Sequence, residues 1–443
     1  MSTCMYLSDE QINELLYIGF NQDNGCFACG TDNGFRIYAV DPFRETFHRT
    51  FANGGIAIVE MLFRCNLLAL VGGGRNPRYP PNKVMIWDDH QNRCIGELMF
   101  KSEVKAVRLR RDRVVVVLQN KVYVYRFSDL KLLDQINTTP NARGLVCLSP
   151  DAAHTVLACP GLAKGSIRVE LYDIKKATLI KAHDSELAQI ALNCDGSRIA
   201  SASDKGTLIR VWDSLSGEPL RELRRGMDRA EIYCLSFSPT TSHLACSSDK
   251  GTIHVFSLSQ PPTPTTATTV MRATNRPIED SPPPPPPTAE LDTGSGSGSA
   301  GNLRSGLAFV KGILPPSLVP RYFDSEWSFA QVRGLEGKSI CAFDYDSPRI
   351  IILTSTGAFM TVSFENGGEC KRLSYSKFID TPTTGPEDVP EPWGAAKEER
   401  SASTVHRLST GSSGMETRAE MTNEREDSAP MNKDNMTAHD NKL

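Results

Sequence analysis

Two near-copies of one short phrase constrain the fold of this chain more than any other feature. The first copy, SASDKGT, covers residues 201–207 and leads into VWD at 211–213. The second, CSSDKGT, covers residues 246–252 and leads into VFS at 255–257. The copies start 45 residues apart, and a repeat of about 40–45 residues that ends in Trp-Asp is typical of a four-stranded propeller blade. The spacing therefore predicts a ring of similar small sheets.

Short runs of β-branched and aromatic residues, separated by Gly, Asn, Asp and Pro turns, recur along most of the chain, and long helical periodicity is absent. We therefore predict an all-β fold, a seven-bladed WD40-type β-propeller that covers residues 14–378. Seven sectors can be laid out at about 14–48, 56–100, 103–136, 143–182, 186–223, from 231 onward, and 338–378. The last sector supplies four candidate strands of its own, so closure of the ring needs no N-terminal strand.

The sixth blade is predicted to be interrupted by a long insertion. Residues 259–306 are rich in Pro, Thr, Ser and Gly, a composition that buries too little apolar surface to order the chain, so we expect disorder there. Residues 307–323 form a candidate membrane-contacting segment, and residues 326–332 are predicted to be the outer strand that completes the blade. The tail, residues 381–443, is charged and nearly free of large apolar residues, and we expect it to be disordered too.

Charge and cysteine use limit the class of protein. The formal net charge of −3 argues against bulk nucleic-acid binding, which favours basic domains, so any anion recognition must be local. The 12 cysteines are mostly scattered singly through strand-like runs, as expected of buried thiols in a reducing cytosol. No basic and apolar leader and no apolar run of about 18 residues is present, which predicts a cytoplasmic protein without a membrane span.

The sequence shows no pattern of a catalytic or metal site. It lacks a nucleophile elbow, a Walker loop and zinc-ligand spacing, and the GGG at 72–74 is not followed by the helix that a phosphate-binding loop requires. Cys26 and Cys29 have no second CxxC or histidine partner nearby. We therefore expect a binding protein rather than an enzyme, with no cofactor and no metal ion.

An arginine pair lies between the two phrases, in the segment LRRG at residues 223–226. In an extended strand successive side chains point to opposite sides, so Arg224 can face the first Ser/Thr cluster while Arg225 faces the second. A phosphomonoester carries roughly −1.5 to −2 charge at pH 7 and needs planar cationic donors plus hydroxyl or backbone N–H donors. The arrangement predicts two anion pockets on adjacent blades. Taken alone, each turn and the arginine pair are also compatible with a plain solvated surface.

LRRG resembles the Phe/Leu-Arg-Arg-Gly signature of the PROPPIN or WIPI proteins, which are seven-bladed propellers that bind phosphoinositides. Other segments that look like this family are FNQD at 20–23, LVGGG at 70–74, PPNKV at 80–84 and WSFA at 327–330. The resemblance covers about 14–378 apart from the insertion. In detail the chain looks most like the WIPI branch that binds the large lipid-transfer protein of autophagy.

The resemblance also implies which residues bind the headgroups. The first phosphoinositide site would comprise Ser201, Ser203, Gly206, Thr207, Arg210, Arg224 and His183. The second would comprise Arg225, Gly226, Ser248, Thr252 and His254. The family prefers phosphatidylinositol 3-phosphate (PtdIns3P) and phosphatidylinositol 3,5-bisphosphate (PtdIns(3,5)P2), and the sequence does not rank them. His183 is also compatible with an ordinary turn histidine of a Trp-Asp repeat, and Asp228, which replaces a histidine of some members, repels a second phosphate unless it points away.

The insertion and the rim of the first blade supply further expected contacts. Four apolar residues of the insertion recur at helical spacing: Leu303, Leu307, Val310 and Leu314. This spacing suits a short amphipathic segment at a membrane interface, or alternatively a segment that packs back onto the blade. Asn21 and Asp23 match the rim where the relevant family branch receives the lipid-transfer protein, and both are also favoured turn residues.

These observations favour a monomeric, non-enzymatic phosphoinositide effector that brings autophagy machinery to phagophore, preautophagosomal and endosomal membranes for autophagosome formation. Its expected partners are phosphoinositide membranes and the autophagy lipid-transfer protein, with no nucleic acid. The alternative is a generic WD40 protein-interaction scaffold without lipid binding.

Overall fold

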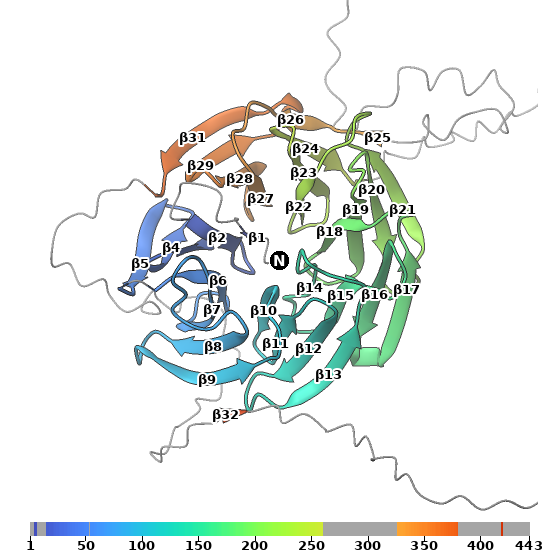
Figure 1. The fold of residues 1–443 in the computed structure, drawn as a ribbon. Helices are drawn as coiled ribbons and strands as arrows, with labels where there is room; N and C mark the ends of the chain where they lie inside the picture. The colour runs from blue at the N-terminus through green and yellow to red at the C-terminus, as the bar shows by residue number, and fades with distance from the viewer. Residues whose placement is uncertain (1–3, 7–14, 53, 260–325, 380–417, 420–443) are drawn as a thin grey trace, which may run out of the picture.

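The computed structural model describes residues 4–6, 15–52, 54–259, 326–379 and 418–419, which form seven β-sheets arranged as a ring around a central axis (Figure 1). This arrangement confirms the predicted all-β, seven-bladed WD40-type propeller. The described residues contain no α-helix and one 3₁₀ turn, η1 (Tyr172–Ile174). Each blade runs from an inner strand at the axis to an outer strand at the circumference.

Blades 1 to 3 contain these strands, in sheet order: β1 (Cys4–Tyr6), β2 (Leu15–Phe20), β3 (Cys26–Thr31), β4 (Gly34–Ala39) and β5 (Arg44–Thr50); β6 (Ile56–Met61), β7 (Leu67–Gly72), β8 (Lys83–Asp88) and β9 (Arg93–Met99); β10 (Ala106–Arg110), β11 (Arg113–Val117), β12 (Lys121–Arg126) and β13 (Leu132–Asn137). Blades 4 and 5 contain β14 (Cys147–Leu148), β15 (Val156–Pro160), β16 (Ser166–Leu171) and β17 (Lys176–Lys181); β18 (Leu187–Leu192), β19 (Arg198–Ser203), β20 (Leu208–Asp213) and β21 (Pro219–Arg224). Blades 6 and 7 contain β22 (Ile232–Phe237), β23 (His243–Ser248), β24 (Thr252–Ser257) and β26 (Ala330–Val332); β27 (Ser339–Phe343), β28 (Arg349–Thr354), β29 (Ala358–Ser363) and β31 (Lys371–Lys377). Three short strands extend outer edges: β25 (Glu326–Trp327) on β21, β30 (Gly368–Glu369) on β26 and β32 (Arg418–Ala419) on β9.

The middle strands of the blades are buried on both faces because each sheet packs between two neighbours. In β19, five of the six residues are buried, and β11 contains four consecutive buried valines at 114–117. The outer strands have one side toward solvent, so β17 alternates between exposed Leu179 and buried Ile180. Small and β-branched runs therefore mark the central strands, and the alternation of half-buried strands is found at the circumference.

Among the described residues, no strand from the N-terminus joins the sheet of blade 7 to close the ring. Blade 7 is built from β27, β28, β29 and β31, all from its own sector, as predicted. The N-terminal strand β1, which precedes the predicted domain start at residue 14, instead pairs antiparallel with β2 at the axis, where Figure 1 marks the N-terminus. β1 therefore adds an inner strand to blade 1.

The predicted outer strand at residues 326–332 is wrong in one respect, because the structure divides it between two blades. β25 pairs in parallel with β21 of blade 5, and β26 pairs antiparallel with β24 of blade 6. An ion pair with 2.6 Å between Arg221 Nη1 and Glu326 Oε1 holds the first half on blade 5. The Phe329 N–H donates to the Val255 carbonyl at 2.7 Å and places the second half on blade 6. This segment therefore connects the two blades at the circumference.

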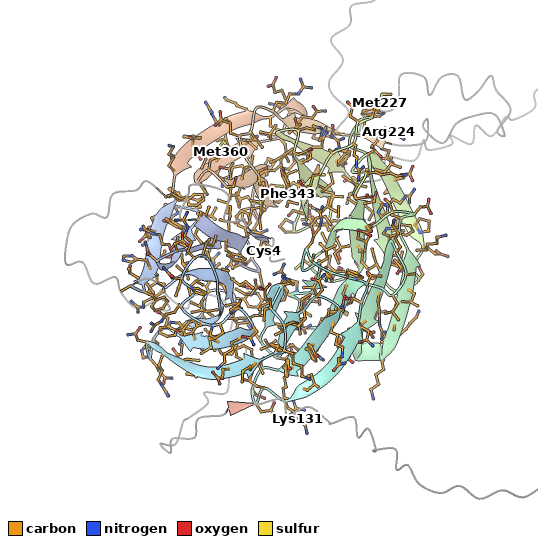
Figure 2. The ribbon with its side chains drawn as sticks, viewed as in Figure 1. Cys4, Lys131, Arg224, Met227, Phe343 and Met360 are labelled. Carbon is orange, nitrogen blue, oxygen red and sulfur yellow. The ribbon has the colours of Figure 1, made fainter. Side chains whose placement is uncertain are left out.

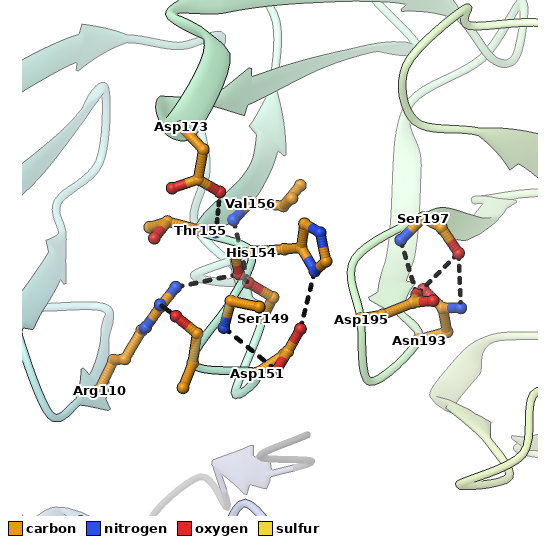
Figure 3. Close-up of polar contacts among 12 residues, drawn as sticks. Arg110, Ser149, Asp151, His154, Thr155, Val156, Asp173, Asn193, Asp195 and Ser197 are labelled. Atoms are coloured by element: carbon orange, nitrogen blue, oxygen red, sulfur yellow. Dashed lines mark hydrogen bonds and ion pairs between the residues drawn. The ribbon is translucent and has the colours of Figure 1, made fainter.

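A buried arginine fixes the β14–β15 loop of blade 4 against blade 3 (Figure 3). Arg110, at the end of β10, donates to the carbonyls of Ala152 and His154 at 3.1 Å each. Within the same loop, Asp151 Oδ2 and His154 Nδ1 are 2.8 Å apart. Because the guanidinium satisfies two loop carbonyls, the contact between these blades is polar as well as hydrophobic.

The inner strands enclose a channel of about 650 Å³ along the axis. Arg108, buried on β10, lies with Nη1 3.5 Å from Glu60 Oε2 of β6, and its Nη2 donates to Cys4 Sγ at 3.1 Å. β1 therefore lines the channel next to a buried ion pair.

Several expectations lie outside the described residues. These are the insertion at 259–306 except Ser259, the candidate membrane-contacting segment at 307–323, and the tail at 381–443 except β32, so Leu303, Leu307, Val310 and Leu314 stay predictions. Within the described ranges, no helical segment has the length and hydropathy needed to span a bilayer. In the same ranges, no group of three or more His, Cys, Asp or Glu side chains is arranged to hold a metal ion.

Candidate anion-binding site

The two repeated phrases form equivalent turns on adjacent blades. SASDKGT connects β19 to β20 in blade 5, and CSSDKGT connects β23 to β24 in blade 6. Gly206 and Gly251 adopt φ angles of +62° and +63°, and each glycine N–H donates to the carbonyl three residues earlier, at 2.9 Å and 3.2 Å. A residue with a side chain is strained in this left-handed region, which explains why glycine recurs. Both phrases therefore lie at the same edge of the ring.

The LRRG segment lies beside the first turn because β21 ends at Arg224. The Arg225 N–H donates to the Thr207 carbonyl at 3.0 Å. Arg225 is only 5% exposed, and its guanidinium donates to the carbonyls of Gly206, at 2.6 Å, and Asp228. Arg225 therefore fixes the loop that follows it against the first turn, whereas Arg224 is half-buried.

The charge of Arg225 also reaches blade 6. Burial, together with the charges of Arg225 and Arg333, lowers the pKa of His254 on β24 to about 4. Two guanidinium groups therefore act on His254 of blade 6. Arg333 was not predicted from the sequence, although Arg333-Gly334 after β26 repeats Arg225-Gly226 after β21 and could have indicated it.

Ser201, predicted for the first pocket, belongs to a buried hydrogen-bond network. This residue is 0% exposed, and its Oγ lies 2.9 Å from His183 Nε2 and accepts a 2.9 Å hydrogen bond from Trp212 Nε1. Burial, together with the charge of Arg210, lowers the pKa of His183 to about 4, so this histidine is neutral at physiological pH. In this structure the polar groups of Ser201 and His183 are thus used inside the protein.

The other predicted side chains of the first pocket lie nearer the surface. Thr207, Arg210 and Arg224 are half-buried, and Ser203 is buried at the end of β19. Arg210 Nε forms an ion pair with Glu222 Oε2 at 2.9 Å. Part of the positive charge of this pocket is therefore balanced by a protein carboxylate.

The second predicted pocket contains a hydroxyl without a protein partner. Ser248, 1% exposed at the end of β23, has no hydrogen-bond partner for its Oγ among the described residues. The adjacent Ser247 hydroxyl, by contrast, donates to the Ser339 carbonyl at 2.6 Å. A buried hydroxyl that stays unsatisfied costs about 1–3 kcal/mol, so water or a ligand is expected to satisfy Ser248.

The rest of the second predicted pocket is more open. Thr252 is half-buried, and its hydroxyl donates over a long 3.4 Å to the Lys250 carbonyl. His254 is buried, with Nδ1 3.2 Å from Ser328 Oγ. A side chain added at Gly226 would meet no atom within 4 Å, so this glycine borders open space.

The loop after the arginine pair carries two exposed side chains of opposite character. Asp228 is exposed, and its backbone carbonyl accepts a hydrogen bond from Arg225. Met227 is 70% exposed and lies with Arg224 at one edge of the ring (Figure 2). Met227 was not predicted as a functional residue, yet an exposed apolar side chain beside arginines suits a surface that meets a membrane.

The predicted partner residues Asn21 and Asp23 lie in the turn between β2 and β3. Asn21 is fully buried, and its Oδ1 accepts a hydrogen bond from the Cys26 N–H at 3.1 Å. Asp23 Oδ1 accepts from the Gly25 N–H at 3.0 Å, and Oδ2 forms an exposed ion pair with Arg64 Nε at 2.9 Å. Asn21 thus shapes the turn, and Asp23 with Arg64 presents charge at the surface.

Fold and site together define a WD-type β-propeller whose rim carries two equivalent hydroxyl turns beside an arginine pair. A profile of the PROPPIN family matches residues 14–272, which is more than half of the chain. The chain therefore belongs to the PROPPIN family, as its sequence segments indicated, and phosphoinositide binding is general to this family.

Similarity to proteins of known name supports the family membership. The chain is 37% identical to Autophagy-related protein 18e of Arabidopsis thaliana over 377 residues, which cover 84% of this chain and 90% of that protein. It is 44% identical to SVP1-like protein 2 of Pichia angusta over 253 residues, which cover 55% of this chain and 70% of that protein.

Solved structures show the same fold at low identity. The structure of Kluyveromyces lactis Hsv2p matches with a TM-score of 0.60 at 22% identity, over 83% of this chain and 100% of that one. The complex of KlAtg21 with the coiled coil of AgAtg16 matches with a TM-score of 0.60 at 24% identity, over 82% and 98%. At these identities the likeness supports the propeller fold alone.

Proposed function

We propose that this protein is a non-enzymatic phosphoinositide effector that binds PtdIns3P and PtdIns(3,5)P2 through two rim pockets and recruits autophagy machinery for autophagosome formation. The observation that carries the proposal is the pair of equivalent turns on blades 5 and 6 with Arg224 and Arg225 beside them. Membership of a phosphoinositide-binding family, with relatives named for autophagy, supports it.

Each pocket supplies the donor types that a phosphomonoester needs. In the first pocket, Arg224 and the Thr207 hydroxyl would bind the phosphate beside the Gly206 turn. In the second, Arg333 and the Ser248 hydroxyl would do so, with Arg225 holding the loop between the two. Because the two histidines are neutral, the positive charge of the pockets comes from arginines, whose planar donors match phosphate oxygens.

Two pockets on one rigid rim make the second binding event intramolecular. A single basic residue near an anionic membrane contributes about 1 kcal/mol, which holds a protein only transiently. Linked binding raises the overall affinity by about 10²–10⁴ without any new contact. Exposed Met227 would add an apolar contact next to the arginines.

We also propose that the rim of blade 1 receives the autophagy lipid-transfer protein and brings it to phagophore, preautophagosomal and endosomal membranes. Asn21 holds the turn, and Asp23 with Arg64 offers paired charges to a polar segment of the partner. Figure 1 places blade 1 away from blade 5, so the two surfaces can be used together. A solved propeller of the same fold, KlAtg21, forms a complex with the coiled coil of AgAtg16.

Replacing Arg224 and Arg225 together by threonine tests the membrane proposal. We expect the affinity of the full chain for vesicles that contain PtdIns3P to fall by about 100-fold or more, because both pockets are impaired and linked binding is lost. Sedimentation with these vesicles, compared with phosphatidylcholine vesicles, measures the loss.

A matched control replaces Arg93 and Arg126, two exposed arginines on blades 2 and 3, and removes the same charge. Because Arg225 is buried and hydrogen-bonded, circular dichroism and thermal unfolding must show that the double variant is folded. Arg224→Thr combined with Arg225→Lys, which keeps one of the two positive charges, should bind better than the double threonine variant. Undiminished binding by a folded double threonine variant would contradict the proposal and favour the generic WD40 scaffold.

A further inference from the structure

The rim contains a related lysine-glycine turn on blade 4, in which the Ser166 N–H, rather than the glycine N–H, closes the turn by donating to the Ala163 carbonyl at 3.0 Å. Lys164, Gly165 and Ser166 connect β15 to β16 as Lys-Gly-Thr connects β19 to β20 and β23 to β24. Gly165 has a φ angle of +68°, close to the +62° and +63° of the two phrases. Turns between the second and third strands of successive blades lie at the same edge of a propeller, because the strand directions repeat around the ring. The three turns therefore form one rim over blades 4, 5 and 6.

The blade 4 turn differs from the two phrases in its chemistry. Ala163 precedes the lysine where Asp204 and Asp249 precede it in the phrases, so this turn lacks the acid. The Ser166 hydroxyl donates to the Ala163 carbonyl at 2.5 Å and is thus used within the turn. Leu162, at the tip, is 70% exposed. The turn therefore offers an exposed apolar side chain with less negative charge, in place of a hydroxyl pocket.

Two exposed lysines lie near this tip. Lys164 is exposed on the turn, and Lys181 is exposed at the end of β17, opposite Ser166 in the strand ladder. Neither lysine forms an ion pair with another described residue. An apolar side chain near lysines suits the interface of an anionic bilayer, since the ammonium groups can reach lipid phosphates while the aliphatic parts stay among the acyl chains.

The blade 4 turn lies directly beside the first predicted pocket. Arg210 Nη1 of that pocket donates to the Ala182 carbonyl at 2.7 Å, one residue after Lys181. The His183 N–H donates to the Gly165 carbonyl at 3.0 Å. Figure 1 shows β16 and β17 beside β20 and β21. A bilayer held at the blade 5 turn is therefore within reach of the blade 4 tip.

We propose that Leu162, Lys164 and Lys181 form a third membrane contact, which binds an anionic phospholipid surface rather than a single headgroup. The inference rests on the proposed function, because the pockets of blades 5 and 6 bring the rim to the membrane. Leu162 enters the interfacial region, and the two lysines bind phosphates of neighbouring lipids of any headgroup. A third point of contact fixes the angle at which the propeller lies on the bilayer.

The full chain with Leu162→Ser, Lys164→Gln and Lys181→Gln tests this contact. We expect its apparent affinity for vesicles of phosphatidylcholine, phosphatidylserine and PtdIns3P to fall about tenfold. Its binding to vesicles with phosphatidylserine but without PtdIns3P should fall as well, because the proposed contact binds anionic lipids of any headgroup. Its affinity for soluble inositol 1,3-bisphosphate should equal that of the wild-type chain.

The matched control carries Leu133→Ser, Lys131→Gln and Lys101→Gln, which remove an exposed leucine and two exposed lysines on blade 3 and the loop before it. Lys131 lies at the edge of the ring opposite Arg224 in Figure 2, so this variant should bind both kinds of vesicle like the wild-type chain.

The blade 4 variant could bind vesicles with PtdIns3P and vesicles without it as tightly as the wild-type chain does. That result would overturn the third contact, but it would not contradict the two proposed headgroup pockets. An equal loss of affinity for the soluble headgroup would also overturn it, because the three residues would then act on the first pocket. Failure of the proposed function gives a different result: the wild-type chain would bind vesicles with and without PtdIns3P equally. The phosphatidylserine vesicles would then still decide whether blade 4 contacts a bilayer.

Discussion

The hydroxyl groups of the rim are of two kinds, those that hydrogen-bond inside the protein and those without a partner among the described residues. Ser201 is of the first kind, with His183 Nε2 and Trp212 Nε1 each 2.9 Å from its Oγ. Because burial lowers the pKa of His183 to about 4, this network is neutral at cellular pH and adds no positive charge. Ser248 is of the second kind, since its buried Oγ has no partner among the described residues.

This contrast makes Ser248→Ala and Ser247→Ala a matched pair. Ser248→Ala removes a hydroxyl that no described group satisfies, so the free energy of unfolding should not decrease. Ser247→Ala removes the hydrogen bond to the Ser339 carbonyl and should decrease it by about 1 kcal/mol. Urea unfolding measures both values. Headgroup binding should show the reverse order, with a several-fold loss for Ser248→Ala only, and equal destabilisation by the two changes would show that Ser248 has a partner inside the protein.

Strand alternation predicts that Ser201 and Ser203 share one face of β19, but it does not predict how deep each one lies. Ser201 is farther from the turn and is covered by Trp212 of β20 and His183 from the end of blade 4. How deeply Ser201 is buried depends on how blades 4 and 5 pack together, and a local sequence pattern does not predict that packing. The position of the arginine pair between the two phrases follows from the sequence, but the hydrogen bonds from the Arg225 guanidinium to the Gly206 and Asp228 carbonyls do not.

At the scale of elements, local patterns identify the blades, whereas partners at the circumference depend on distant residues. The SDKGT turns, the Trp-Asp endings and the β-branched runs are all short-range features, so the seven sectors follow from them. Residues 326–332 are predicted as one strand because hydropathy does not identify a strand's neighbour. The structure divides them through the Arg221–Glu326 ion pair, which joins residues 105 positions apart.

Glu326→Gln should loosen β25 from blade 5 without unfolding the propeller. The ion pair with Arg221 is partly exposed, so its loss is expected to cost about 1 kcal/mol or less. Amide hydrogen exchange of peptides covering 326–332 should become a few-fold faster, while peptides from blade 3 stay unchanged. Glu336→Gln, at an exposed acid on the loop after β26, is the matched control. Unchanged exchange at β25 would mean that the backbone ladder alone holds this strand.

At the scale of the whole molecule, the ring keeps the proposed membrane and partner surfaces apart. The rim turns belong to blades 4, 5 and 6, and the Asp23–Arg64 pair belongs to the turn of blade 1 and the loop of blade 2 (Figure 1). With a net charge of −3 the chain as a whole does not attract anions, so attraction to a membrane must come from local cations on the rim. A closed ring of packed sheets holds those cations at fixed spacing, which linked binding requires.

Each of the two neighbouring blades is therefore expected to bind one headgroup, and calorimetric titration of the full chain with soluble inositol 1,3-bisphosphate counts those sites directly. We predict two sites in the wild-type chain, one in Arg224→Thr, one in Arg333→Thr, and none when both substitutions are combined. A single site in the wild-type chain, or the loss of both sites with either single substitution, would contradict two independent pockets.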